Sequence, residues 1–410
     1  MNKSVLDDNI QAAVILSSIF RSAYGPKGMN KLLVDNIGDT FVTKDGASII
    51  DNIEVKHPVA KLLAEAAETM EEEVGDGSKT AVILAGELLK KAGELVSEGM
   101  HPMMIVKGYQ LALNKTLRVL DKKSLKNSDK GVVKSLIKTA LLTNDYLTET
   151  VYEAVKDTSV EDITTLKKRS RGEAVVVNGV VIDKERVHPG MPKKAVNAKI
   201  LVTKTPLEVR ETATSSELEI TSPSQLSSLL EKEHESIKEV ISSIKKSGAD
   251  VVLCQKGISD QAQEYLAKNG VIGVRRIREK DINYLLKATD AKLVSDLTTI
   301  KPSDLGTGDV YTERVGDERL TFINNCPGGV KTILIRGATE QLIDEVEKSV
   351  LNALGVVKAF RAEKSYVPGA GVIEKIISNE LLKKLPGGKE QLSYTAFAKA
   401  LEKVIQALIT

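Results

Sequence analysis

The sequence is short of aromatic residues and has no tryptophan. Aromatic side chains make up 3% of its 410 residues, so few rings are available to stack on unpaired bases. Its 58 Lys and Arg residues against 56 Asp and Glu residues give a net charge of only +2. Nucleic-acid-binding domains usually carry a clear basic excess. We therefore expect no nucleic acid among the partners.

Long apolar runs are also missing. No stretch approaches the ~20 apolar residues that a transmembrane helix needs, and the N-terminal sequence MNKSVLDDNIQ has no apolar signal core. We expect no membrane association and a cytoplasmic location. The two cysteines, Cys254 and Cys326, lie in or beside apolar strand patterns. This placement favours buried, reduced thiols.

Signatures of histidine metal sites and of nucleophilic catalysis are absent. Three of the four histidines, His57, His101 and His188, precede proline. None of the four is followed by a ligand-type side chain three or four residues later. The sequence contains no G-x-S-x-G motif and no Walker A motif. The phosphate-binding chemistry considered next must therefore come from other loops.

Three glycine-punctuated turns stand out in the first 80 residues. The last of them, EEEVGDGSKT at 71–80, leads into a strongly patterned amphipathic helix. Free backbone N–H groups at such a helix start bind phosphate, and Asp76 has the carboxylate that Mg²⁺ prefers beside phosphate oxygens. Taken alone, a Gly-Asp-Gly sequence is more often an ordinary turn.

The other two turns supply the remaining parts of a nucleotide site. AYGPKGMNK at 23–31 places Lys27 in a tight loop from which it can reach a phosphate. FVTKDGASII at 41–50 predicts a short strand, a turn with Asp45, and a helix start. We therefore predict that Lys27, Asp45 and Asp76 face one pocket that binds a triphosphate and its Mg²⁺.

In this order the segments resemble the N-terminal half of group II chaperonin subunits of the archaeal thermosome type. The quoted turns are accompanied by HPVAKLL and MHPMMIVKGY. The similarity continues through VNGVVIDKERVHPGMP, GADVVLCQKGISDQAQEYLAKNGVIGVRRI, KATDAKLVS, SDLGTGDV and KTILIRGATEQLIDEVEKS. The resemblance implies a molecular chaperone, a subunit of an ATP-driven double ring that binds Mg-ATP and unfolded or non-native proteins. Other chaperonin subunits, in a hetero-oligomeric ring, are the implied partners.

The implied fold is multidomain, with α and α/β parts, as a chain of this length also suggests. It comprises an equatorial nucleotide-binding domain (1–128 and 367–410), an intermediate hinge domain (129–180 and 331–366) and an apical substrate-binding domain (181–330). Composition along the chain agrees. Residues 1 to 125 are helical in pattern, and short apolar strands alternate with helices from 181 to 330. The basic segment at 167–172 reads as a flexible junction.

A capping box, Ser222-Pro223-Ser224-Gln225, predicts the start of a helix in the apical region that stops before Gly248. The middle of this helix, 231–235, is entirely polar, so it should stand in water. An ordinary surface helix explains the pattern equally well. The resemblance instead implies a protrusion that acts as a built-in lid.

The resemblance assigns the site residues one by one. The positions expected to bind nucleotide are Gly25, Pro26, Lys27, Gly46, Gly75, Asp76, Gly77, Ser78, Lys79, Thr80, Gly369, Ala370 and Gly371. Asp76 is the expected Mg²⁺ ligand. Asp45 and Asn352 fall on the catalytic positions. Asn352 replaces the family's aspartate, and an amide cannot take up a proton at neutral pH.

Other departures point to weakened hydrolysis. Lys79 replaces a hydroxyl of the family's Gly-Asp-Gly loop, and no lysine occurs at 140–145, where the family has a phosphate-sensing one. The chain also ends at Thr410, before the family's remaining equatorial residues, so we expect weaker binding and incomplete ring closure by this chain alone. The alternative is a non-hydrolysing structural or regulatory chaperonin-like subunit. A third interpretation, a metabolic kinase that uses the same glycine loops, has no support, because the sequence shows no set of residues that would bind a small substrate.

Overall fold

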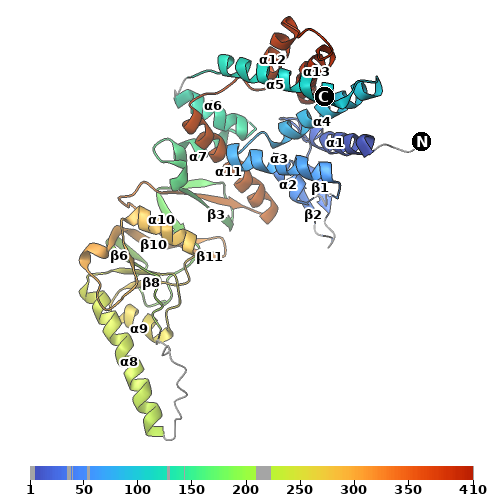
Figure 1. Cartoon of the computed structure of the whole chain (residues 1–410). Coiled ribbons are helices and arrows are strands. Elements are labelled where there is room, and N and C mark those ends of the chain that lie inside the picture. Colours follow the sequence, from blue (N-terminus) through green and yellow to red (C-terminus); the bar gives the residue numbers. More distant parts are fainter. Residues whose placement is uncertain are drawn as a thin grey trace. The chain divides into compact units, whose positions relative to one another are not determined.

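Figure 1 shows the computed structural model of the chain. The structure describes residues 5–34, 38, 40–52, 56–126, 130–142, 144–208 and 223–409. They form two compact units. The first, here the helical unit, consists of Met1–Tyr152 and Lys348–Thr410. The second, here the sheet unit, is Glu153–Glu347. The chain therefore leaves the helical unit and returns to it, in agreement with the nested order expected from the sequence. The five-segment domain division stays a prediction.

The helical unit is built around the long helix α4. Its elements are α1 (Val5–Arg21), β1 (Lys31–Val34), β2 (Thr40–Thr43), α2 (Gly46–Asn52), α3 (Pro58–Val74), α4 (Ser78–Ser97), α5 (Pro102–Lys123), α6 (Lys130–Ala140), α12 (Val372–Lys383) and α13 (Gln391–Ile409). Two more helices, α7 (Asp145–Val155) and α11 (Glu340–Glu363), cross the boundary between the units. β1 and β2 form an antiparallel pair.

Small residues let the helices of this unit approach closely. A Cβ added at Gly86 of α4 would lie 2.3 Å from the Cβ of Ser17 in α1. Beside this contact, Arg21 donates to the carboxylate of Glu87, whose side chain is 7% exposed. Phe20, Ile49 and Ile83 are fully buried in the core that α1, α2 and α4 share. This packing fixes the start of α4, where the Gly-Asp-Gly turn lies.

The histidines before prolines have structural roles. Nδ1 of His57 accepts from the backbone N–H of Val59 at the start of α3, at 3.3 Å. His101 caps α5 in the same way through Met103, at 3.2 Å. Proline then occupies the first turn, where its missing N–H costs nothing. Across the described residues, no group of three or more His, Cys, Asp or Glu side chains is placed to hold a metal ion.

The sheet unit contains two sheets. Its elements are η1 (Val160–Asp162), β3 (Ile163–Arg169), β4 (Val175–Val177), β5 (Gly179–Ile182), β6 (Lys194–Thr203), α8 (Pro223–Lys246), β7 (Val251–Cys254), α9 (Asp260–Lys268), β8 (Ile272–Val274), α10 (Glu279–Thr289), β9 (Leu293–Val294), η2 (Pro302–Asp304), β10 (Gly306–Val315), β11 (Glu318–Asn324) and β12 (Lys331–Gly337). The larger sheet has the order β5-β11-β10-β6-β7-β8, with β9 beside β6. The smaller sheet has the order β3-β12-β4. The short apolar strands that the sequence predicted between 181 and 330, alternating with helices, are confirmed by β6, β7, β8 and β9.

Alternate residues of the central strands face two different cores, as strand geometry requires. Ile200 and Val251 pack with α10 on one face of the large sheet. Leu201, Val252 and Cys254 pack with α8 and α9 on the other. Both faces are therefore covered, and this explains why these strands are continuous apolar runs in the sequence.

The basic segment predicted as a flexible junction is instead partly a strand. Lys167, Lys168 and Arg169 belong to β3, which pairs in parallel with β12. Lys167 forms ion pairs with Asp344 and Glu347, at 2.8 and 2.9 Å. The prediction was wrong because these charged side chains point to acidic partners beside the strand, and their charge does not prevent backbone pairing.

The helix predicted from the capping box is α8, and Figure 1 shows it running away from the large sheet. Ser222 lies outside the described residues, so its capping role stays a prediction. Ile237, Ile241 and Ile244 are buried against the sheet, while His234 and Glu235 are exposed, as their polarity predicted. Among the described residues, no helix is both long and apolar enough to span a membrane.

Candidate functional site

Two of the three predicted turns meet directly. Gly46, at the start of α2, packs against the start of α4. A Cβ added at Gly46 would lie 2.5 Å from Oγ of Ser78 and 3.1 Å from Cγ of Lys79. The Nζ of Lys79 also donates to the backbone carbonyl of Lys44, at 3.0 Å. Glycine at 46 thus allows the Lys-Asp-Gly turn to lie on the first turn of α4.

Asp45 is held at the start of α2 by that helix. Its Oδ2 accepts from both the backbone N–H and the Oγ of Ser48, each at 2.9 Å. Lys348 of α11 donates to the same Ser48 hydroxyl, and its Nζ lies 4.0 Å from Oδ2 of Asp45. A hydroxyl and an ammonium group therefore orient this carboxylate before any ligand arrives.

The Gly-Asp-Gly turn leaves backbone donors available. Gly77 is the N-cap of α4 and has no side chain to accept from the first-turn N–H groups. Asp76 Oδ1 accepts from the N–H of Gly77, at 2.7 Å. The carboxylate of Asp76 is exposed, but many protein atoms surround it, and this partial desolvation raises its pKa, as does the nearby Asp45. Asp45 and Asp76 are therefore brought into one electrostatic environment.

Helix α11 places Asn352 at this turn. Gly75 closes α3 in the left-handed region, with φ +80°. A Cβ added there would lie 2.6 Å from the backbone O of Asn352 and 2.8 Å from Cα of Gly355. The two backbones are thus in contact. This contact supports the sequence match that puts Asn352 at the catalytic aspartate's position, although the role of its side chain stays a prediction.

The first turn is linked to α4 through Tyr24. Its hydroxyl lies 2.8 Å from Oγ1 of Thr80. Burial raises the pKa of Tyr24, and the carboxylates of Glu374 and Asp76 raise it further. Lys27 and Pro26 are exposed. Asp45 and Asp76 act on each other electrostatically, and their sharing one nucleotide site with Lys27 stays a prediction.

A second uncapped helix start faces the same neighbourhood. Gly371 is the left-handed N-cap of α12, without a side-chain cap. Ala370 also has a positive φ of 56°, while Gly369 is exposed. Glu374, in the first turn of α12, acts electrostatically on Tyr24. The turn at 369–371 therefore precedes a helix whose first turn acts electrostatically on Tyr24, while its own part in the site stays a prediction.

Sequence reasoning missed three polar residues of this site: Ser48, Lys348 and Tyr24. Lys348 precedes Asn352 by four residues, one helical turn on the same face of α11. That spacing could have identified it once Asn352 was placed. Tyr24 lay inside a quoted motif, but nothing in the motif gave its hydroxyl a partner.

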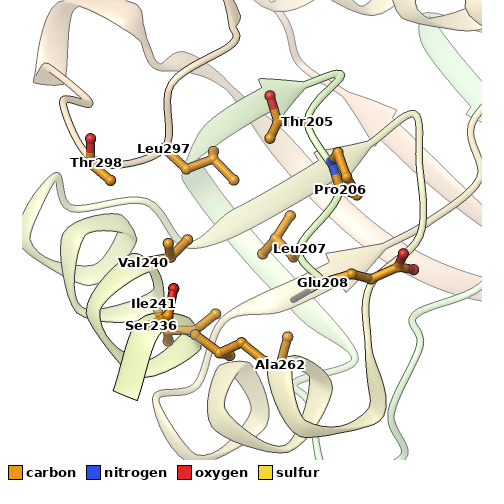
Figure 2. A pocket seen from close by; sticks show the side chains of 11 residues that line it. Thr205, Pro206, Leu207, Glu208, Ser236, Val240, Ile241, Ala262, Leu297 and Thr298 are labelled. Carbon is orange, nitrogen blue, oxygen red and sulfur yellow. The ribbon is translucent and has the colours of Figure 1, made fainter. Parts of the chain in front are cut away.

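The sheet unit has an apolar pocket of its own, of about 120 Å³. Figure 2 shows its side chains facing a common space between α8, α9 and two loops. Leu207 and Leu297 come from the loops, Val240 from α8 and Ala262 from α9. Thr205, Ser236 and Thr298 add hydroxyls to the lining. The pocket can accept an apolar side chain with polar groups around it.

Both cysteines are free thiols. Cys254 is buried, as predicted, and Cys326 is partly buried. Burial raises the pKa of each to about 11. The Sγ of Cys254 donates to the carbonyl of Thr205, at 3.3 Å. These are structural thiols, since nucleophilic cysteines need a lowered pKa.

Comparison with known proteins agrees with the geometry. Residues 16–410 match the model of the TCP-1/cpn60 chaperonin family. Thermosome subunit alpha of Archaeoglobus fulgidus is 44% identical over 425 residues, covering 98% of this chain and 78% of the relative. A thermosome subunit of Pyrococcus horikoshii is 44% identical, covering 98% and 77%. Thermosome subunit beta of Methanothermobacter thermautotrophicus is 43% identical, covering 98% and 78%. The match over nearly the whole chain, on a nested fold with its glycine turns assembled, shows that this protein belongs to the TCP-1/cpn60 chaperonin family, in its group II branch.

Proposed function

We propose that this chain is a molecular chaperone subunit that binds Mg-ATP in its helical unit and non-native protein in its sheet unit. Membership of the family implies nucleotide binding. The observation that carries the proposal is the packing of Gly46 on Ser78 and of Gly75 on Asn352. These two contacts gather both carboxylates and an uncapped helix start.

The donor set suits a triphosphate. The first-turn N–H groups of α4 and of α12, at Gly77 and Gly371, offer two anion sites. Asp76 and Asp45 supply the oxygen ligands that Mg²⁺ prefers, with phosphate oxygens completing its shell. Bound Mg²⁺ would neutralise phosphate charge. Tyr24 and Thr80, bonded to each other, tie the first glycine turn to the start of α4.

We propose that this site hydrolyses ATP only slowly. Asp45 can still polarise a water molecule, but Ser48 and Lys348 already engage its carboxylate. Asn352 cannot accept a proton. Without a second general base, the rate falls by about 10²–10⁴-fold. The alternative is a subunit that never hydrolyses ATP and has a structural or regulatory role. The two proposals differ only in whether a slow ATP turnover remains.

The apolar pocket of the sheet unit supports binding of non-native protein. It lies at the base of α8, beside the loop at 205–208. Unfolded chains expose apolar side chains that a partly polar pocket of this kind can accept. We further propose that the chain assembles with other chaperonin subunits in a double ring, in the cytoplasm, with the equatorial, intermediate and apical limits given above.

Titration of the purified chain with ATP in the presence of Mg²⁺ tests the proposal. We expect measurable affinity, and a loss of about tenfold or more in Asp76→Ala, since a charge-assisted contact contributes about 1.5–3 kcal/mol. Glu72→Ala, an exposed carboxylate four residues earlier, is the matched control and should bind as the parent does. No affinity in the unmodified chain would refute the proposal.

A further inference from the structure

Lys79 brings an ammonium group into the proposed nucleotide site. Its Nζ is fixed by the hydrogen bond to the carbonyl of Lys44, at 3.0 Å. Its side-chain stem packs on Gly46. Burial lowers the pKa of Lys79, and both Asp45 and Asp76 raise it. The ammonium group is therefore attracted by the same two carboxylates that would otherwise repel each other.

The local fold does not need a lysine here. Neighbouring hydroxyls take up the structural contacts: Ser78 packs against Gly46 and Thr80 bonds to Tyr24. Gly77 starts the helix without help from position 79. A threonine or serine at 79 could continue the first turn of α4 but could not reach the carbonyl of Lys44. What lysine adds is its charge and that hydrogen bond.

The charges around the two carboxylates are already balanced by protein groups. Lys348 lies 4.0 Å from Asp45, and Lys44 is close enough to Lys79 to lower its pKa by repulsion. Glu71 adds a third carboxylate to this set, so three ammonium groups face three carboxylates and their charges balance. Without Lys79 the same set would carry one net negative charge, and a triphosphate would depend on a metal ion to offset it.

We propose that Lys79 takes over part of the role of the divalent cation, so that this site binds metal-free nucleoside triphosphate as well as the magnesium complex. The inference rests on the proposed nucleotide site. In a site with only carboxylates, a metal-free triphosphate would meet like charges. Here the ammonium of Lys79 stands beside those carboxylates and at the helix start that receives phosphate.

Calorimetric titration with ATP, in excess MgCl₂ and again in EDTA, tests this inference. The unmodified chain should lose less than about tenfold in affinity on chelation. Lys79→Thr should lose more than about tenfold in EDTA relative to its own affinity in MgCl₂, and Lys79→Arg should behave as the parent. Each tenfold change corresponds to 1.4 kcal/mol. Lys90→Thr removes an exposed lysine farther along α4 and should change neither value.

The outcomes separate the two claims. A parent chain that binds in MgCl₂ but loses affinity about a hundredfold or more in EDTA would overturn the role of Lys79 and leave the nucleotide site standing. Equal losses in the parent and in Lys79→Thr would do the same. No binding under either condition would overturn both. Circular dichroism melts of each variant establish that a lost affinity is not lost folding.

Discussion

The contact between Gly75 and α11 gives the sharpest structural prediction. Alanine at 75 must adopt φ near +80°, which costs an L-residue about 1–2 kcal/mol. Its Cβ would also lie 2.6 Å from Asn352 O and 2.8 Å from Gly355 Cα. Both are backbone atoms that cannot rotate away, and overpacking of this kind costs about 1–3 kcal/mol more. Gly75→Ala should therefore destabilise the helical unit by about 2–5 kcal/mol.

Gly99 offers a matched control. It has φ +92°, but no atom lies within 4 Å of an added Cβ. Gly99→Ala should therefore show only the conformational cost of about 1–2 kcal/mol. For a unit of this size each kcal/mol lowers Tm by about 2–4 °C. Scanning calorimetry of both variants measures the difference. Equal shifts in Tm would show that the Gly-Asp-Gly turn does not press against α11, and the placement of Asn352 would fail with it.

Four further predictions concern charge and reactivity. Asn352→Asp should raise ATP turnover by about 10²–10⁴-fold in a steady-state phosphate-release assay; unchanged turnover would show that the position is misassigned. Arg21→Met should lower the free energy of unfolding in urea by about 3–5 kcal/mol, because it leaves the carboxylate of Glu87 buried and unpaired. The double variant with Glu87→Met should recover most of this loss; equal losses in the single and the double variant would contradict the reasoning. Cys254, with its pKa raised to about 11, should resist iodoacetamide at pH 8 until urea unfolds the chain; rapid native labelling would show the thiol is accessible. The raised pKa of Asp76 means that the folded chain keeps this proton to a higher pH than the unfolded one, so stability falls as pH rises above the ordinary value of 3.8. Asp76→Asn should therefore raise the free energy of unfolding at pH 7, by only a few tenths of a kcal/mol because the carboxylate is exposed. At pH 3 it should change nothing. Urea midpoints at both pH values measure the difference, and a loss of stability at pH 7 would contradict the predicted sign.

Local patterns predicted the strands that are buried on both faces. β7 and the end of β6 are apolar because both faces of their sheet are covered. The short strand β1, Lys31–Val34, was missed. Its alternating burial over only four residues gives a signal too weak to distinguish from a loop.

Contacts between distant segments could not be predicted in the same way. Lys348 and Ser48 are separated by 300 residues along the sequence, and no local pattern pairs them. The resemblance placed Asn352 near the Gly-Asp-Gly turn because it carries the family's three-dimensional arrangement. It gave no partner for Lys348 or for Tyr24, although both lie inside quoted segments, because a motif does not say which distant side chain each of its residues contacts.

Hydrogen–deuterium exchange, followed by mass spectrometry with and without ATP and Mg²⁺, tests most directly whether the glycine turns form one ligand site. We predict that ATP slows exchange together in 23–31, 44–50, 75–82 and 369–374, and leaves the strands of the sheet unit unchanged. Slowed exchange in a single one of these segments, or in none, would contradict the account.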